Sequence, residues 1–188
     1  MTRRLTISGA AVAAVLLSAA AAPAQVHPHP AEGKVRTTAP SIQIPAAMKA
    51  EHAELHAALG TATRAPGAVG EAARAVAAVL HPHFQREEEI ALPPLGLLAP
   101  LARGGVTPQM AEILPLTDAL QAELPQMLAE HTRIQAALEA LARTARREGR
   151  PEYAQLAEKI MSHAAMEEQV NYPAALLVGA HVRRQLGR

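Results

Sequence analysis

Apolar residues recur along most of the chain at the three- and four-residue spacing of amphipathic helices. Breaks in this pattern coincide with Pro and Gly residues, which mark the ends of helices. The pattern predicts four main helices, over residues 46–64, 69–92, 126–148 and 152–172. Pro93-Pro94 ends the second helix, and Pro173 interrupts the fourth. A last helical stretch over residues 174–186 follows or continues the fourth helix.

The segment between the second and third helices carries six prolines within residues 93–125. We expect a long connection there, with short helices around residues 109–114 and 118–123. Because Ala and Leu dominate the apolar content and aromatic residues are only 2% of the chain, the composition favours helices over β-sandwiches and barrels. The fold class is therefore predicted to be all-α.

The first residues have the layout of a secretory signal peptide. Arg3 and Arg4 precede an apolar, Ala-rich run, and Ala22-Pro23-Ala24 provides small residues for cleavage after Ala24. We expect a periplasmic or secreted protein with no stable membrane span after cleavage. The predicted organisation is a signal peptide over residues 1–24, a flexible linker over 25–44 and a helical domain over 45–188.

The two halves of the helical body resemble each other, with residues matching at an offset of 79 or 80. The matches are Glu51-His52 with Glu130-His131, His83-x-x-x-Glu87-Glu88 with His163-x-x-x-Glu167-Glu168, and Leu92-Pro93 with Tyr172-Pro173. Several matches at nearly one offset indicate a duplicated helical hairpin. Packing the two hairpins together gives an antiparallel four-helix bundle.

Four histidines of this bundle are expected at one level. In an antiparallel hairpin, residues equally far from the turn lie at the same height. The midpoint between His52 and His83 falls at the Pro66-Gly67 break, and the midpoint between His131 and His163 falls beside Gly149. Such bundles build metal sites from inward side chains on facing helices.

Residues four apart share a helix face, so two of these histidines each bring a glutamate toward the same interior. The predicted metal ligands are His52, His56, His83, Glu87, His131, His163 and Glu167. Imidazole and carboxylate ligands suit iron, manganese or zinc, and two central carboxylates suit a bridge between two ions. The absence of cysteine excludes thiolate sites and disulfides. A net charge of +1 indicates no nucleic-acid partner.

The remaining His and Glu residues are predicted to lie outside the ligand set. Glu88, Glu89 and Glu168 are expected to point away from the ligand face, and His81 and His181 lack partners at their level. For Glu51 and Glu130, the sequence leaves open whether they orient ligands or lie on the surface.

We also expect the two ions to differ. His52 and His83 would serve one ion, and His131 and His163 the other. His56, one turn from His52, would give the first ion a third imidazole, whereas its counterpart Gln135 is a poor ligand. The second ion would then keep an open position for a small ligand.

The motifs quoted above make residues 45–178 similar to the hemerythrin-like family, also called the HHE cation-binding domain. The resemblance implies a four-helix bundle around two iron ions, with manganese or zinc less favoured. It implies terminal ligands at His52, His83, His131 and His163, and bridging carboxylates at Glu87 and Glu167. The chain departs from the oxygen carriers of the family, which carry Asp at i+5 where Glu167 stands at i+4, and a histidine where Gln135 stands.

Three function classes remain. The favoured one is an exported di-iron protein that binds or senses O2 or a related diatomic ligand. The alternatives are a di-iron enzyme acting on peroxide, nitric oxide or ferrous iron, and an iron-buffering module. A ferritin-like site would need Glu-x-x-His on two helices, which this sequence lacks. The oligomeric state is left open.

Overall fold

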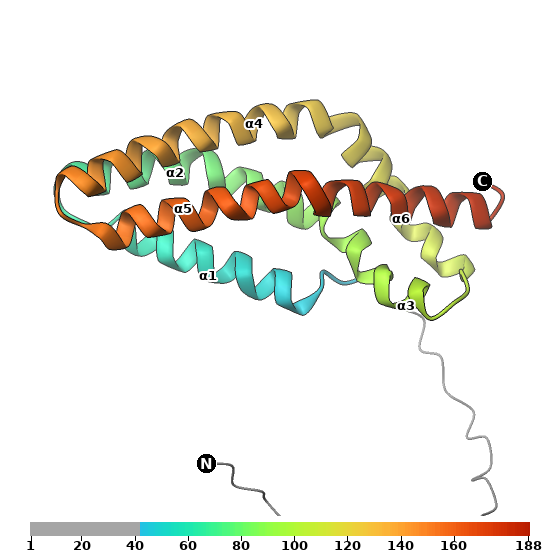
Figure 1. The fold of residues 1–188 in the computed structure, drawn as a ribbon. Helices are drawn as coiled ribbons and strands as arrows, with labels where there is room; N and C mark the ends of the chain where they lie inside the picture. Colours follow the sequence, from blue (N-terminus) through green and yellow to red (C-terminus); the bar gives the residue numbers. More distant parts are fainter. Residues whose placement is uncertain (1–41) are drawn as a thin grey trace, which may run out of the picture. The chain divides into compact units, whose positions relative to one another are not determined.

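The computed structural model describes residues 42–188, and every regular element in this part of the chain is helical. Its main helices are α1 (Ala46–Ala62), α2 (Gly67–Arg86), α4 (Leu114–Arg147) and α5 (Pro151–Met166), which run antiparallel (Figure 1). The prediction of an all-α antiparallel four-helix bundle is confirmed. The predicted signal peptide and residues 25–41 of the predicted linker lie outside the described residues.

Both hairpins turn at the same end of the bundle (Figure 1). After α4, Gly149 adopts a positive φ of 66°, and the Arg150 N–H donates to the Ala145 carbonyl at 2.8 Å. This is a Schellman ending, for which glycine is favoured because it carries no Cβ. The first hairpin turns over residues 63–66, and Gly67 begins α2 with a φ of 71°. The Pro and Gly breaks in the sequence therefore located both turns.

The third main helix begins earlier than predicted. α4 starts at Leu114, so residues 118–123 belong to it instead of forming a separate short helix. Pro115 lies in the first turn, where its missing N–H costs no hydrogen bond. Pro125 lies inside the helix and is exposed, while the buried Leu120 and Met127 anchor the helix on both sides of it. Tertiary packing thus overrides the helix-breaking tendency of Pro125.

Two of the main helices, α2 and α5, continue through turns of π-helix. α2 passes into η1 (Glu87–Ala91), and α5 passes into η4 (Glu167–Asn171) and then α6 (Tyr172–Gln185). The last helical stretch therefore continues the fourth helix, which was one of the two alternatives, and the expected interruption at Pro173 is absent because Pro173 falls in the first turn of α6. The rest of the long connection forms η2 (Pro93–Leu97), α3 (Leu98–Ala102) and η3 (Pro108–Ile113).

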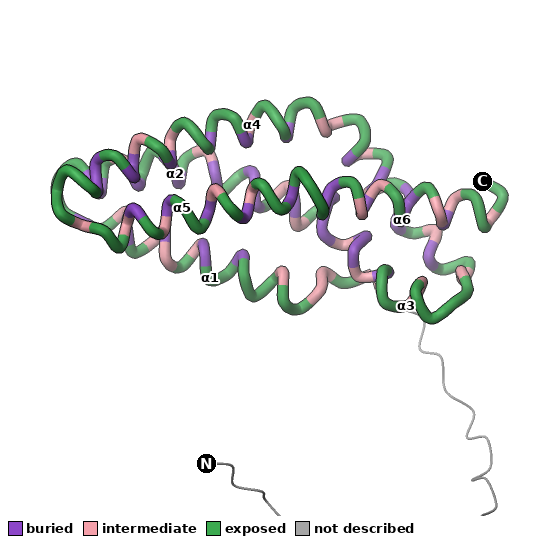
Figure 2. Tube along the Cα trace, viewed as in Figure 1, coloured by how far each residue is buried: buried purple, intermediate pink, exposed green. Residues whose placement is uncertain are grey.

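The buried positions line the inward sides of the helices (Figure 2). One apolar cluster fills the bundle on the side of the hairpin turns and includes Leu59, Leu80, Leu138 and Ile160. A second cluster lies beyond the level of the four histidines and consists of Ile90, Ala91, Leu92, Leu95, Leu120, Met127, Tyr172 and Ala175. Ile44, which the sequence assigned to the linker, packs against this second cluster. The histidine level is thus enclosed between two apolar regions.

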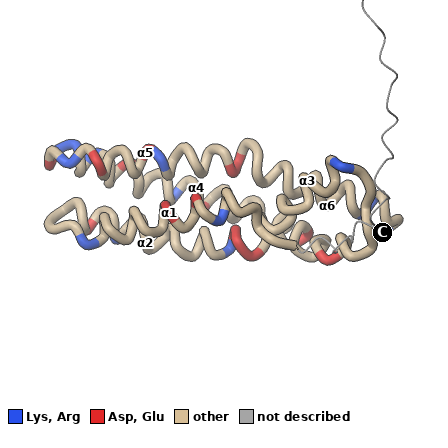
Figure 3. The backbone as a smooth tube through the Cα atoms, turned by 90° about the horizontal axis from the view of Figure 1, so that it is seen from below, with Lys and Arg blue, Asp and Glu red and all other residues tan. Residues whose placement is uncertain are grey.

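Charged residues of both signs are distributed along the helices (Figure 3). Some of them tie neighbouring helices together. The Arg86 Nε–H of α2 donates to Glu123 of α4 at 2.8 Å, and Lys159 of α5 donates to Glu54 of α1 at 2.6 Å. Among residues 42–188, no helix combines the length and apolar character that a membrane crossing requires.

Close packing of α6 on α4 depends on Gly179. A Cβ added there would lie 2.4 Å from Thr117 Oγ1 and 2.7 Å from its Cβ. We expect Gly179→Ala to destabilise the protein by about 1–3 kcal/mol through overpacking. Gly60→Ala is the matched control, because its Cβ would meet nothing nearer than Arg64 Nη1 at 3.8 Å, and it should stabilise by about 0.5–1 kcal/mol. Urea unfolding of the two variants in one buffer measures both values, and equal effects would contradict this account of the interface.

Candidate metal centre

One histidine from each main helix reaches the bundle interior at a common level. His52 comes from α1, His83 from α2, His131 from α4 and His163 from α5, and all four are buried. The structure thus brings together the four histidines that the sequence placed at one height.

Glu87 and Glu167 join the histidines and are completely buried. Each is the first residue of a π-turn. The N–H of Leu92 donates to the Glu87 carbonyl at 2.9 Å, and the carbonyl of Glu167 accepts from the N–H of Tyr172 in the same way. In such a turn the residue five positions on, instead of four, lies over the first residue. The π-turns therefore bring positions 92 and 172 over the glutamates.

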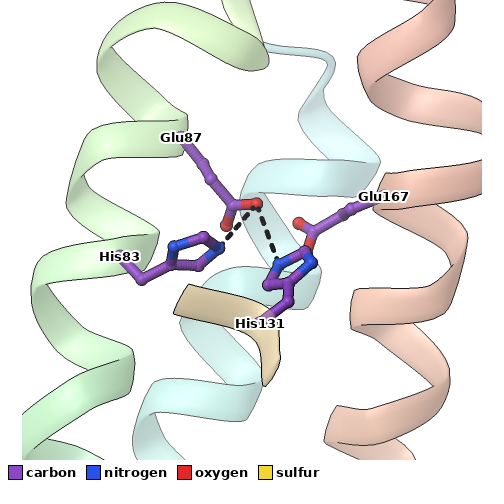
Figure 4. A group of neighbouring side chains, drawn as sticks. All are labelled: His83, Glu87, His131 and Glu167. Atoms are coloured by element: carbon purple, nitrogen blue, oxygen red, sulfur yellow. Dashed lines mark ion pairs between the residues drawn. The ribbon is translucent and has the colours of Figure 1, made fainter. Parts of the chain in front are cut away.

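The six side chains form two overlapping groups. His83 and His131 lie with both glutamates in one group (Figure 4), and His52 and His163 lie with Glu167 in the other. The structure groups the rings differently from the predicted sharing of one ion by His52 and His83 and of the other by His131 and His163. Equal distance from a turn fixes how far along the bundle a ring lies but not which neighbouring ring it faces. The His83 and His131 rings face each other between α2 and α4, and the His52 and His163 rings between α1 and α5.

Each glutamate turns one oxygen toward each histidine pair. Glu167 Oε1 lies 2.9 Å from His163 Nε2 and 3.3 Å from His52 Nε2, whereas its Oε2 lies 3.5 Å from His131 Nε2. Glu87 Oε1 lies 3.4 Å from His83 Nε2 and 3.9 Å from His131 Nε2. The Oε2 of Glu87 lies 3.9 Å from His52 Nε2. Both carboxylates therefore span the two pairs.

A second ring of four glutamates lies behind the histidines. Glu88 and Glu168 accept hydrogen bonds from the Nδ1–H groups of His52 and His131, at 3.2 and 2.8 Å. As predicted, both carboxylates lie outside the two inner groups and remain partly exposed, but the structure adds a contact with the histidines that was not expected. The question left open for Glu51 and Glu130 is also answered. Glu130 accepts from His83 Nδ1–H at 2.8 Å, and Glu51 lies 3.3 Å from His163 Nδ1.

The outer glutamates follow the repeat and connect different helices. Glu51 of α1 holds a histidine of α5, and its counterpart Glu130 of α4 holds a histidine of α2. A carboxylate can only accept, so Nδ1 carries the proton of each ring in its neutral form, and the Nε2 lone pair would then face inward toward a cation. Neutral imidazoles in this tautomer are ready to bind a cation.

Tyr172 also reaches this interior, and the sequence analysis had assigned it no role there. Its buried hydroxyl donates a hydrogen bond to Glu87 Oε1 and lies 3.4 Å from His83 Nε2 and 3.3 Å from His131 Nε2. The signal was present in the repeat, because Leu92 stands at the equivalent position. A polar replacement for leucine beside the histidine level marks a place where the two halves differ.

His56 joins neither histidine group, in contrast to the prediction. Its half-buried ring stacks on that of His81, with the two Nδ1 atoms 2.8 Å apart. Phe84 lies between this pair and the interior, since it contacts His56 edge-on and stacks on His52. The expectation that His81 lacks a partner at its level was wrong, because residues 56 and 81 are also nearly equidistant from the first turn.

The interior has polar atoms that the protein alone does not satisfy. Glu87 Oε2, Glu167 Oε2 and His163 Nε2 are buried and have no hydrogen-bond partner. His163 Nε2 is close to Glu167, but the contact lacks the alignment of a hydrogen bond. Leaving such groups unpaired in an apolar surrounding is costly. Cations among the Nε2 and carboxylate atoms would satisfy all three, and this donor set fits iron, manganese or zinc.

The pKa values reflect the same crowding. Burial and the charge of Glu167 raise the pKa of Glu87. Burial acts in the same direction on Glu167, but its close contacts with His131, His163 and His52 outweigh it and hold that pKa well below its usual range. Burial lowers the pKa of His83, yet the hydrogen bonds and charge of Glu87 and Glu130 raise it to about 9. Without a metal, protons must therefore supply the compensating positive charge.

Residues 43–175 match the family model of the hemerythrin HHE cation binding domain. The searches of curated proteins and of solved structures gave no match.

The metal-free protein should lose stability as the pH rises from 6.5 to 9. The pKa of His83 is higher in the folded protein, about 9, than its ordinary value of 6.5. Its protonation therefore stabilises the fold fully below pH 6.5, and this contribution disappears as the pH passes 9. Thermal unfolding in excess chelator across this range measures the effect. His83→Gln should flatten the pH dependence and His81→Gln should not, and an equal slope in all three proteins would refute the assignment.

Glu130→Ala should weaken metal binding by about 10–100-fold, because it removes the acceptor that holds the His83 ring. Glu139→Ala is the control, since Glu139 lies on the same helix, is exposed and contacts only neighbouring surface residues. Competition with a chromophoric chelator for ferrous iron gives both affinities. Equal affinities for the two variants would show that Glu130 does not support the site.

Proposed function

The chain belongs to the hemerythrin family of HHE cation-binding domains, and on this premise we propose that it is an exported, non-haem di-iron protein that binds O2 or a related small diatomic ligand. The buried His and Glu residues within the region that matches the family supply the metal-binding side chains. The number and identity of the ions, the ligand and the export are the proposed elements.

The orientation of Glu87 and Glu167 carries the di-iron proposal. A carboxylate that presents one oxygen to each of two imidazole pairs is arranged to bridge two cations. His83 and His131 would hold one ion, and His52 and His163 the other. One ion would leave part of this donor set, and its buried negative charge, without compensation. Two iron ions supply open coordination positions and exchangeable electrons for a diatomic ligand.

The surrounding residues prepare the site for such a ligand. Glu88 and its three counterparts hold the rings so that their Nε2 atoms face inward. The apolar clusters on either side of the histidine level limit the entry of water. The Tyr172 hydroxyl lies beside His83 and His131, so by turning its proton from Glu87 it can donate to a polar ligand atom on that side of the centre.

Tyr172 also favours a second candidate, a di-iron enzyme acting on peroxide, nitric oxide or ferrous iron. Its phenol holds a proton next to the centre, because burial and the charge of Glu87 raise the pKa of the hydroxyl. A proton donor at this place suits a reaction that consumes protons as well as simple ligand binding. The third class, iron buffering, requires no such donor.

The export proposal is supported by the sequence of the first 24 residues alone. The paired arginines, the Ala-rich apolar run and the small residues before Gln25 form the layout of a cleaved signal peptide. We place the mature protein in the periplasm or outside the cell. N-terminal sequencing of protein recovered from cell fractions would find Gln25 as its first residue.

Anaerobic loading with ferrous iron should give about two ions per chain, because the donors form two pairs joined by two carboxylates. Metal analysis measures the stoichiometry, and one ion per chain would contradict the di-iron proposal. Visible spectra on exposure to air then separate the function classes. A band that appears with O2 and disappears when O2 is removed supports ligand binding, turnover with irreversible change supports an enzyme, and the absence of any response supports buffering.

A further inference from the structure

The two hairpins fill the space outside their histidines differently. In the first hairpin, the buried Phe84 stacks on His52 with ring centroids 4.2 Å apart and an interplanar angle of 16°. Its ring also meets His163 edge-on at 5.5 Å. His56 and His81 close the surface outside Phe84. The His52/His163 pair is therefore covered by aromatic rings on the side of α1 and α2.

The second hairpin has smaller or unbranched side chains at the equivalent positions. At the offset of 79 or 80, Ala164 is the repeat equivalent of Phe84, Gln135 of His56 and Met161 of His81. All three line a cavity of about 200 Å³ between α4 and α5. We call this cavity the α4–α5 pocket, and its main lining residues are His131, Ile134, Gln135, Leu138, Met161 and Ala164. The pocket exists where the first hairpin has Phe84.

The pocket adjoins the histidine level directly. Its lining includes His131 and the carboxylate that holds His131, Glu168. By the repeat, a group in the space above Ala164 would contact His131 as Phe84 contacts His52. The pocket thus borders the His83/His131 pair, the same pair that Tyr172 approaches. The aromatic cover and the open space distinguish the two ends of the centre.

The chemistry of the lining fits a small neutral molecule. Ile134, Leu138, Met161 and Ala164 supply apolar surface. Polar atoms come from Gln135, His131 and Glu168, and the carboxylate of Glu168 disfavours an anion. An apolar cavity of about 150 Å³ is large enough to take up xenon or benzene. We propose that the α4–α5 pocket binds a neutral diatomic gas molecule against His131 and gives it access to the His83/His131 end of the metal centre. This inference rests on the proposed function and specifies the route by which the gas reaches the metal centre.

Xenon tests the pocket without any metal. Crystals of the metal-free protein under xenon pressure should show an atom bound between α4 and α5, and Ala164→Phe should abolish that binding by placing in the pocket the residue that the first hairpin uses. Ala164→Leu fills part of the same space and serves if the phenylalanine variant does not fold. Ser162→Phe is the matched control, because Ser162 lies on α5, is exposed and is outside the pocket. It should retain xenon.

The rate of gas uptake tests the route. In the iron-loaded protein, Ala164→Phe should slow the uptake of O2 or nitric oxide by about tenfold or more, because entry then requires the new ring to move. Its iron content should equal that of the wild type, and Ser162→Phe should keep the wild-type rate. No xenon in the wild-type pocket, or an unchanged rate in a variant that has lost xenon, would overturn the inference. Failure of the proposed function would appear separately, as wild-type protein that takes up no gas.

Discussion

Two carboxylates buried among four imidazoles are the constraint on which the rest of this structure depends. Glu87 and Glu167 have no exposed surface, and one oxygen of each lacks a hydrogen-bond partner. Negative charge in such a place requires cations or protons nearby. The outer glutamates direct the ring protons away from the interior, so the inner face of the site offers lone pairs. The buried negative charge of the two carboxylates is therefore left uncompensated by the protein alone. Metal ions can compensate it better than protons can.

The backbone provides what this charge arrangement needs. Each inner glutamate begins a π-turn that is followed at once by a proline-initiated segment. The π-turn changes which side chain lies over the glutamate, and this is how Tyr172 comes to face the centre. Apolar clusters above and below exclude other polar partners. Irregular helix geometry thus lies at the site, where helical irregularities often mark function.

Much of this could be predicted from the sequence, because helix breaks and repeat spacing fix heights. The Pro and Gly breaks located both turns, and the turns then fixed the level of the four histidines. The pairing of the rings could not be predicted, since it depends on the outer carboxylates, such as Glu130, that orient them from neighbouring helices. The start of α4 was missed because buried neighbours override the effect of Pro125. The contacts of Glu88 and Glu168 with the histidines were missed because both residues stand in acidic runs, which are usually exposed to solvent.

The repeat also explains why the centre is not symmetric. Duplication supplies the same His and Glu residues to both hairpins. Residues that match between the hairpins therefore build the common site, and residues that differ distinguish its two ends. His56 was expected to cause the difference as a ligand, but it lies with His81 on the outer face. The difference instead arises from Tyr172 in place of leucine and from Ala164 in place of phenylalanine. One substitution adds a hydrogen-bond donor and the other opens a pocket, and both act at the His83/His131 end. Two independent changes at one end of a duplicated site are the basis for proposing that a small ligand meets the centre there.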